Sequence, residues 1–347
     1  MSTERKSIKL IFIALVQMLL VALTVGALGE METLAAPTDS PITIRFSSFF
    51  PPTAKVIPIF KELETIIPKR TDGKVEFRFY PGSQLYGLVE GLQAVADGAI
   101  QMTHGGSFAA PISRGWSVVS GLAFLFEDRA HLMRFYETDV FKTLNKGLEA
   151  RGIKHIANAG NMGELQLANF KVPVKDLNDL PKVKFRTPQS PLVLESVRML
   201  GAQVVSIATA ELGSALETGM VDGHINTWEP FEIFKIPGRK LYITDCNIST
   251  LPATMIANLK FWNTLSPELQ QTLVEIFEDA GRKISQTQDE SESACINRFK
   301  ADPNTVITKL PKADKARWKE KIRALYDRVK GESDESRKIV EAAERTM

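Results

Sequence analysis

Residues 182–192 read KVKFRTPQSPL, a pattern that predicts a short strand ending at a rigid turn. Apolar Val183 and Phe185 alternate with basic residues, which is the period of a half-buried β-strand. Pro188 cannot donate to a strand ladder and disfavours helix before it, so the strand must end at once. A strand that ends on Arg186 has two interpretations: a solvated strand end, or a cation directed into a cleft.

The segments on the N-terminal side alternate between strand and helix patterns. ITIRF (42–46), KVEFRFY (74–80) and AIQMT (99–103) are typical of strands, and helical patterns cover 54–67 and 88–96. Strands that alternate with helices indicate βαβ units and a mostly parallel sheet. The sequence therefore predicts an α/β fold.

A repeated unit suggests two similar α/β lobes. LQAVADGAIQ (92–101) and GSALETGMVD (213–222) both read as helix, glycine stop and short apolar strand. Between them, Ser190 and Pro191 fit the first positions of a helix that Gly201 ends.

The C-terminal third is predicted to be helical. LSPELQQTLVEIFEDAGRKI (265–284) has Ser266 as N-cap, Pro267 in the first turn and one apolar stripe, which predicts a long helix. From Asp314 the tail is charged and helical, and Trp318 is expected to dock it on the core together with Leu325.

The first residues predict an export signal. Three basic side chains up to Lys9 precede an uncharged run from Leu10 to Gly29, and small residues follow. We expect residues 1–36 to be a signal peptide and the protein to be periplasmic. A retained membrane anchor is the alternative, because the run is about long enough to span a bilayer.

Charge and cysteine content are uninformative about chemistry. A formal net charge of +2 gives no reason to expect a nucleic-acid partner. Cys246 and Cys295 are the only cysteines; they could pair after export or remain buried thiols.

Motifs for catalysis are missing. The chain has no G-x-x-x-x-G-K-[ST], no G-x-G-x-x-G after a strand and no G-x-S-x-G. Its four histidines lack metal-ligand spacing, although His104 and His224 accompany the paired strands and could line a cleft. We expect no cofactor, no metal and no enzyme activity; an exported α/β enzyme would need a nucleophile–base pair or a metal cluster.

Polar and aromatic residues gather where the predicted strands end. Ligands of open α/β sheets bind beyond the carboxyl ends of strands. The candidate loops are Ser47–Phe50, Gly105–Ser107, Arg186–Thr187 and Asn226–Trp228. The arginine fork matches a carboxylate, Asn226 brings donors and an acceptor, and Trp228 offers a flat wall. The set, with Phe49 and Ser107, suits a small organic acid, while the aromatic residues fit an apolar acid or ordinary core packing.

Six segments in one order carry a family resemblance. They are DGKVEFRFYPGSQLYG (72–87), GLQAVADGAIQM (91–102), GLAFLFEDRAHLMRF (121–135), VKDLNDLPKVKFRTPQSPL (174–192), ELGSALETGMVDGHIN (211–226) and KFWNTLSPELQ (260–270). Over nearly the whole chain after the signal, the sequence resembles the periplasmic solute-binding subunits of TRAP transporters, the DctP-like family.

The resemblance implies a two-lobed periplasmic binding protein fold, with hinge strands and a long connecting helix. Lobe I would comprise 37–163 plus about 252–291, and lobe II 164–251 plus about 292–347. A monomer of this kind would close on a small carboxylate and deliver it to the TRAP membrane subunits. The alternative output is a signal, in which the liganded receptor docks on a sensor protein.

The resemblance also implies roles for particular residues. Arg186, in the K-h-R-x-P segment, would form the principal salt bridge to the solute carboxylate, and Asn226 would reach the same ligand. Many members carry another arginine where this sequence has Gln166. Gln166 can still hydrogen-bond a ligand, but the lost charge argues against solutes that need two arginines, such as sialic-acid-like sugars.

Overall fold

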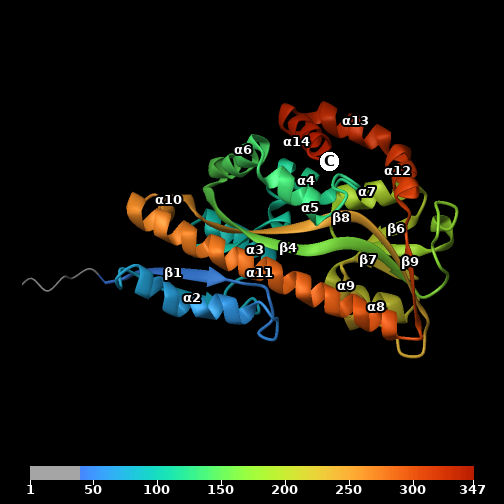
Figure 1. Cartoon of the computed structure of the whole chain (residues 1–347), viewed down its shortest axis with the longest axis horizontal. Coiled ribbons are helices and arrows are strands. Elements are labelled where there is room, and N and C mark those ends of the chain that lie inside the picture. The colour runs from blue at the N-terminus through green and yellow to red at the C-terminus, as the bar shows by residue number, and fades with distance from the viewer. Residues whose placement is uncertain (1–39) are drawn as a thin grey trace, which may run out of the picture. The chain divides into compact units, whose positions relative to one another are not determined.

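A single mixed sheet organises residues 40–347, the part of the chain that this computed structural model describes (Figure 1). Its strands run in the order β2-β1-β3-β8-β4-β7-β5-β6, and β9 pairs with β8. The strands are β1 (Ile42–Ser47), β2 (Val75–Tyr80), β3 (Met102–Gly106), β4 (Ile153–Asn169), β5 (Lys184–Thr187), β6 (Gln203–Ser206), β7 (Gly223–Asn226), β8 (Leu241–Asn258) and β9 (Thr305–Lys309).

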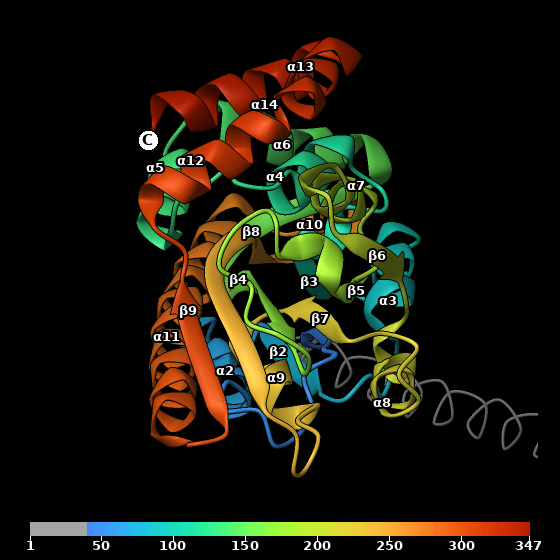
Figure 2. The ribbon, with the colours of Figure 1, turned by 90° about the vertical axis from the view of Figure 1, so that its right-hand side faces the viewer.

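Helices cover both faces of this sheet. They are α2 (Ile57–Arg70), α3 (Leu88–Ala96), α4 (Arg114–Gly121), α5 (Arg129–Tyr136), α6 (Asp139–Gly147), α7 (Pro191–Leu200), α8 (Leu212–Glu217), α9 (Trp228–Ile233), α10 (Leu259–Trp262), α11 (Pro267–Ala301), α12 (Lys312–Lys321), α13 (Arg323–Glu332) and α14 (Asp334–Arg345). Helix α11 lies along β4, whereas α12–α14 pack over α4, α5 and α7 (Figures 1 and 2). The predicted α/β fold is confirmed.

Two sets of parallel strands are joined by two long antiparallel strands. In the first set β1 pairs with β2 and β3, and in the second β5 pairs with β6 and β7, all in parallel. Strands β4 and β8 run through both regions and pair with each other along their length, with several register shifts. Their position is that of the expected hinge strands, because β3 of the first set pairs with β8 and β7 of the second set pairs with β4.

The register brings the carboxyl ends of the two strand sets toward the same stretch of β4 and β8. Strand β3 ends at Gly106, opposite Ala253 of β8, and β7 ends at Asn226, opposite Gln166 of β4. Gln166 in turn hydrogen-bonds the backbone of Asn247. Ala253 and Asn247, which mark the ends of the two strand sets, are thus about six residues apart along β8, or roughly 20 Å in an extended strand. The two strand sets point toward this stretch of β8 from opposite directions.

Helix α11 forms as its sequence predicts. Ser266 accepts a hydrogen bond from the Leu269 N–H at 3.3 Å, and Pro267 opens the helix. The predicted apolar stripe is buried at Leu273, Ile276, Phe277, Ala280 and Ile284. Gly281 lets the helix approach β4 closely, because a Cβ there would overlap the Asn158 carbonyl oxygen.

Two predicted boundaries were wrong. The helix expected over 54–67 spans 57–70, because Pro68 falls in its last turn, where a missing N–H costs only one helical bond. The strand expected over 99–103 spans 102–106. The N–H groups of Ala99 and Ile100 both donate to the Ala94 carbonyl and so close α3 instead of entering the sheet.

Other sequence predictions are confirmed in part. Helix α7 runs to Leu200 and ends at Gly201 with φ of 105°, although the Ser190 side chain makes no capping bond. Trp318 and Leu325 are buried, as expected of docking residues. The cysteines are free and buried in different hydrophobic clusters, so the thiol alternative holds.

Residues 41–347 form one compact unit, so the predicted lobe boundaries stay predictions. The predicted signal peptide, 1–36, lies outside the described residues. From residue 40 onward, no helix combines the length and apolar character needed to cross a membrane.

Candidate functional site

Arg186 is a buried cation without a counter-charge. Its side chain is 1% exposed, near the end of β5. Its Nε donates to the Ile207 carbonyl at 2.8 Å and one terminal nitrogen donates to Thr209 Oγ1 at 3.0 Å. No acidic side chain within residues 40–347 pairs with it, and burial lowers the pKa of the guanidinium to about 10. The solvated-strand-end interpretation is therefore wrong.

His224 lies beside this arginine. The two residues are direct partners in the parallel register of β5 and β7, so their side chains project to the same face of the sheet. The His224 ring is 0% exposed, and neither ring nitrogen has a hydrogen-bond partner in the described part of the chain. Burial, and secondarily the charge of Arg186, lowers the pKa of His224 to about 3, so the ring is neutral.

Asn226 and Gln166 occupy the next positions on the same face. They are paired partners on β7 and β4, and Asn226 is two residues beyond His224. Asn226 is partly buried, and its Oδ1 accepts the N–H of Thr227 at 3.1 Å. The structure thus brings three predicted site residues, Arg186, Asn226 and Gln166, to one face.

The Gln166 amide is largely committed to the backbone of β8. Its Oε1 accepts the N–H groups of Cys246 at 2.7 Å and Asn247 at 2.8 Å, and its Nε2 donates to Asn247 Oδ1 at 2.6 Å. Asn247 has a positive φ of 48°, so the amide stabilises an irregular turn of the strand. One amide N–H of Gln166 is left for a ligand.

Phe49 and Ser107 follow the ends of β1 and β3. The Phe49 ring is half-buried and lies 4.5 Å from Phe50, 4.8 Å from Phe108 and 5.1 Å from His104, measured between ring centroids. Ser107 Oγ has no hydrogen-bond partner among residues 40–347. Both predicted residues therefore lie at the carboxyl end of the first strand set, which is directed toward Asn226.

His104 lies edge-on to four phenyl rings, those of Phe46, Phe49, Phe50 and Phe60. Its Nε2 is 2.8 Å from Ser48 Oγ, while Nδ1 is buried and finds no partner in the described chain. Burial lowers its pKa to about 3. Both histidines at the strand ends are thus neutral polar groups with unused hydrogen-bonding capacity.

Trp228 is placed in the core. It is the first residue of α9, is 3% exposed, and its ring lies 6.3 Å from Phe231 and 6.2 Å from Phe299 of α11. Its predicted contact with a solute stays a prediction. The observed position makes it a support for the turn that follows Asn226.

A second arginine, Arg129, is partly buried and faces acidic side chains. Arg129 forms an ion pair with Asp289, approaches Glu292 at 3.8 Å, and donates to the Asn161 carbonyl at 3.0 Å. The Asn161 side chain donates to Glu164 at 2.9 Å. Burial raises the pKa of Glu164, and burial together with the Glu164 charge raises that of Glu292 to about 7.

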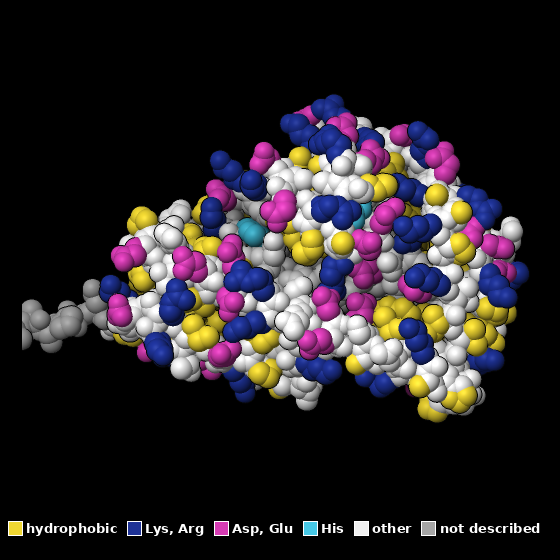
Figure 3. Space-filling view, viewed as in Figure 1, with side chains coloured by type: hydrophobic (Ala, Val, Ile, Leu, Met, Phe, Trp, Pro, Cys, Tyr) yellow, Lys and Arg dark blue, Asp and Glu magenta, His cyan; other side chains and the backbone are white. Residues whose placement is uncertain are grey.

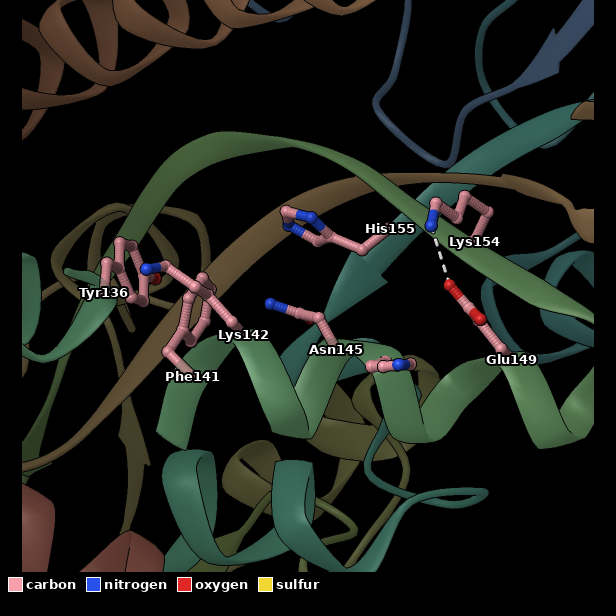
Figure 4. Close-up of a pocket in the computed structure, with 8 residues that line it drawn as sticks. Tyr136, Phe141, Lys142, Asn145, Glu149, Lys154 and His155 are labelled. Atoms are coloured by element: carbon pink, nitrogen blue, oxygen red, sulfur yellow. Dashed lines mark hydrogen bonds and ion pairs between the residues drawn. The ribbon is translucent and has the colours of Figure 1, made fainter. Parts of the chain in front are cut away.

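A cavity of about 500 Å³ opens elsewhere, between α6 and the beginning of β4 (Figure 4). It contains none of the predicted site residues. Its lining comprises Tyr136, Phe141, Lys142, Asn145, Lys146, Glu149, Lys154 and His155. Lys154 is paired with Glu149 at 2.7 Å, and the Tyr136 and Phe141 rings stack at 4.4 Å.

Acidic and basic side chains are interspersed on the face seen in Figure 3, without a dominant patch of one sign. In the described range 40–347, no three His, Cys, Asp or Glu side chains gather in a way that could hold a metal ion.

The fold and the site define a class: an α/β solute-binding protein with two strand sets that approach a common pair of hinge strands. Residues 46–332 match the family model "Bacterial extracellular solute-binding protein, family 7". The chain belongs to this family, and the predicted resemblance is confirmed.

Two relatives and one solved structure place the chain within the family. It is 28% identical to a C4-dicarboxylate-binding periplasmic protein of Rhodobacter capsulatus, over 88% of this chain and 92% of that protein. It is 29% identical to the 2,3-diketo-L-gulonate-binding periplasmic protein of Escherichia coli K12, over 72% and 76%. A TRAP periplasmic solute-binding protein from Ochrobactrum anthropi has the same two-lobed fold, with a TM-score of 0.81 and 22% identity over 88% and 95% of the chains.

Proposed function

We propose that this protein captures a small organic acid in the periplasm and delivers it to the membrane subunits of a TRAP-type transporter. Residues 1–36 act as the export signal, and the exported chain works as a monomer without catalysis. Family membership supports the solute-binding role, and the relatives named for dicarboxylate and sugar-acid binding support the carboxylate class.

Arg186 is the proposed anchor for the solute carboxylate. The observation that carries this assignment is a guanidinium that is 1% exposed and has no acidic partner in residues 40–347. A buried charge of this kind is costly unless an opposite charge joins it. A carboxylate with two parallel hydrogen bonds supplies that charge and matches the fork.

The other predicted residues complete the proposed site. Asn226 donates to the bound acid, Gln166 offers it the remaining amide N–H, and Trp228 provides a flat apolar wall. Phe49 and Ser107 contact the solute from lobe I, 37–163 plus about 252–291, when lobe II, 164–251 plus about 292–347, closes on it about β4 and β8. Hinge closure is an established way for ligand contact to select one state.

The test begins with native mass spectrometry of the protein purified from periplasm, which identifies a co-purified acid. Calorimetry with that acid then compares the wild type with Arg186→Ala and Lys184→Ala. Truncating one partner of a buried charge pair costs about 2–5 kcal/mol, or roughly 30-fold to several thousand-fold in affinity. Equal and small effects of the two substitutions would refute the anchor role.

A further inference from the structure

We propose that the solute is a monocarboxylate with an apolar or aromatic body, and that the His224 ring binds its carboxylate together with Arg186. This inference rests on the proposed function and narrows it to one substrate class. It excludes C4-dicarboxylates and polyhydroxylated sugar acids, the ligands after which the two relatives are named.

The first argument is the charge that the strand ends offer. Arg186 has no acidic partner among the described residues. Arg129, by contrast, is already paired with Asp289 and lies near Glu292, so it is not free to bind a second carboxylate. Gln166 adds no charge, and its amide is mostly committed to the backbone of β8. A second carboxylate of a bound solute would therefore lose its hydration without gaining a counter-charge, which is strongly unfavourable.

The second argument is the unused hydrogen-bonding capacity of His224. A neutral imidazole has one N–H donor and one acceptor nitrogen, and here both lack a partner within residues 40–347. Buried polar groups nearly always have partners, so a buried ring with none marks a place where a missing group belongs. Since His224 is the register partner of Arg186 on the same face, a carboxylate on the guanidinium can accept its N–H.

The third argument is the chemistry of the opposite strand ends. Phe49 and Phe50 contact His104 there, Phe108 contacts Phe49, and all three phenyl rings are only half-buried, unlike the rings of the core. These rings fit a flat or apolar body by edge-to-face or offset contact. A sugar acid would place several hydroxyl groups against these phenyl rings, which offer them no conventional hydrogen-bond donor or acceptor.

The experiment is a competition measured by native mass spectrometry and calorimetry. The full-length protein is incubated with an equimolar mixture of phenylacetate, 3-phenylpropionate, succinate and D-gluconate, and the retained acid is identified. We expect a phenyl acid to be retained, with at least about 10-fold higher affinity than succinate or gluconate. A tenfold difference in affinity corresponds to about 1.4 kcal/mol of binding free energy. One buried aromatic contact, together with the absence of a second, unpaired carboxylate on the solute, can supply this amount.

Three variants separate the parts of the inference. Phe49→Ala should weaken the phenyl acid about 10-fold, and His224→Phe, which keeps a ring of similar shape without N–H, should do the same. Arg186→Ala should abolish binding. Thermal unfolding of each variant confirms that it is folded.

The possible failures differ from one another. Retention of succinate or gluconate that disappears in Arg186→Ala overturns the substrate class and leaves the receptor function standing. Unchanged binding in His224→Phe overturns the role of that ring. Retention of none of the acids, or retention that Arg186→Ala does not affect, overturns the substrate class and the proposed anchor together.

Discussion

Arg186 and His224 are direct register partners on the parallel strands β5 and β7, and neither has a charged partner in residues 40–347. Placing a cation and an unpaired imidazole side by side in a buried position opposes folding, because both groups lose hydration without full compensation. A binding site that awaits an anion requires such an arrangement. Stability and function are therefore expected to conflict at this pair.

The first prediction concerns that conflict. Arg186→Met should raise the free energy of unfolding of the ligand-free protein by on the order of 1 kcal/mol, because an apolar chain of similar length replaces an uncompensated buried charge. Urea denaturation measures the change. Lys184→Met, two residues earlier on the same strand and partly exposed, is the control and should change stability by less than about 0.5 kcal/mol. A loss of stability in Arg186→Met would mean that the bonds to Ile207 and Thr209 outweigh the cost of the charge.

The second prediction concerns the amide of Gln166. Gln166→Arg should destabilise the protein by about 2–4 kcal/mol, because an arginine cannot accept the N–H groups of Cys246 and Asn247 and leaves both unpaired. Gln166→Glu is the matched control: its carboxylate still accepts both, and the Asn247 amide can turn to donate to it. Thermal and urea unfolding of the two variants should therefore differ clearly. Equal stabilities would show that the amide does not hold this turn of β8.

Sequence patterns predicted the local features of the site and missed the long-range ones. The strand that carries Arg186 was predictable, since alternation and a following proline act over a few residues. The commitment of Gln166 to Cys246 was not, because the partner lies 80 residues away and no local pattern encodes the pairing. The packing of the Trp228 ring against Phe299 was not predictable either, because the two residues lie on elements far apart in the sequence.

The lengths of β4 and β8 were also beyond the sequence patterns. Each strand spans both strand sets, but register shifts interrupt the pairing of β4 with β8 at several points between His155 and Leu167. Every such shift moves the following side chains out of phase, so a long strand does not show a continuous period of two. The two similar lobes were indicated by the repeated helix–glycine–strand unit, whereas the hinge strands that join them were expected only from the family resemblance.

The third prediction concerns pH. Burial and the neighbouring Glu164 charge raise the pKa of Glu292 from 4.5 to about 7, against the opposing charge of Arg129. The folded state therefore binds more protons than the unfolded state between these values, and stability falls as the pH rises from about 4.5 to 7. Glu292→Gln removes this loss. Its stability advantage over the wild type should be about 2 kcal/mol larger at pH 8 than at pH 5.

Urea denaturation at the two pH values measures this difference. Glu290→Gln, on the same helix and hydrogen-bonded only to Gln286 at 2.9 Å, is the control and should give the same small effect at both. A Glu292→Gln advantage that does not depend on pH would show that this carboxyl titrates normally in the folded protein.

The fourth prediction concerns the contact between α11 and β4. Gly281→Ala should destabilise the protein by about 1–3 kcal/mol, although alanine favours helix over glycine by about 1 kcal/mol. The added Cβ would overlap the Asn158 carbonyl oxygen, which is backbone and cannot move without displacing β4. Gly331→Ala in α13 is the matched control, because nothing lies within 4 Å of its added Cβ.

That control should gain about 0.5 kcal/mol, less than an interior position, because Gly331 is in the last turn of its helix. Opposite signs for the two glycine substitutions in urea unfolding would establish that α11 is held against β4 by close backbone approach. If Gly281→Ala were as stable as Gly331→Ala, the helix could shift on the strand, and the hinge would be looser than its packing indicates. Because α11 packs along the hinge strand β4, Gly281→Ala should also weaken solute binding if closure depends on this contact. Gly281 itself is remote from Arg186 in sequence and lies on a different element.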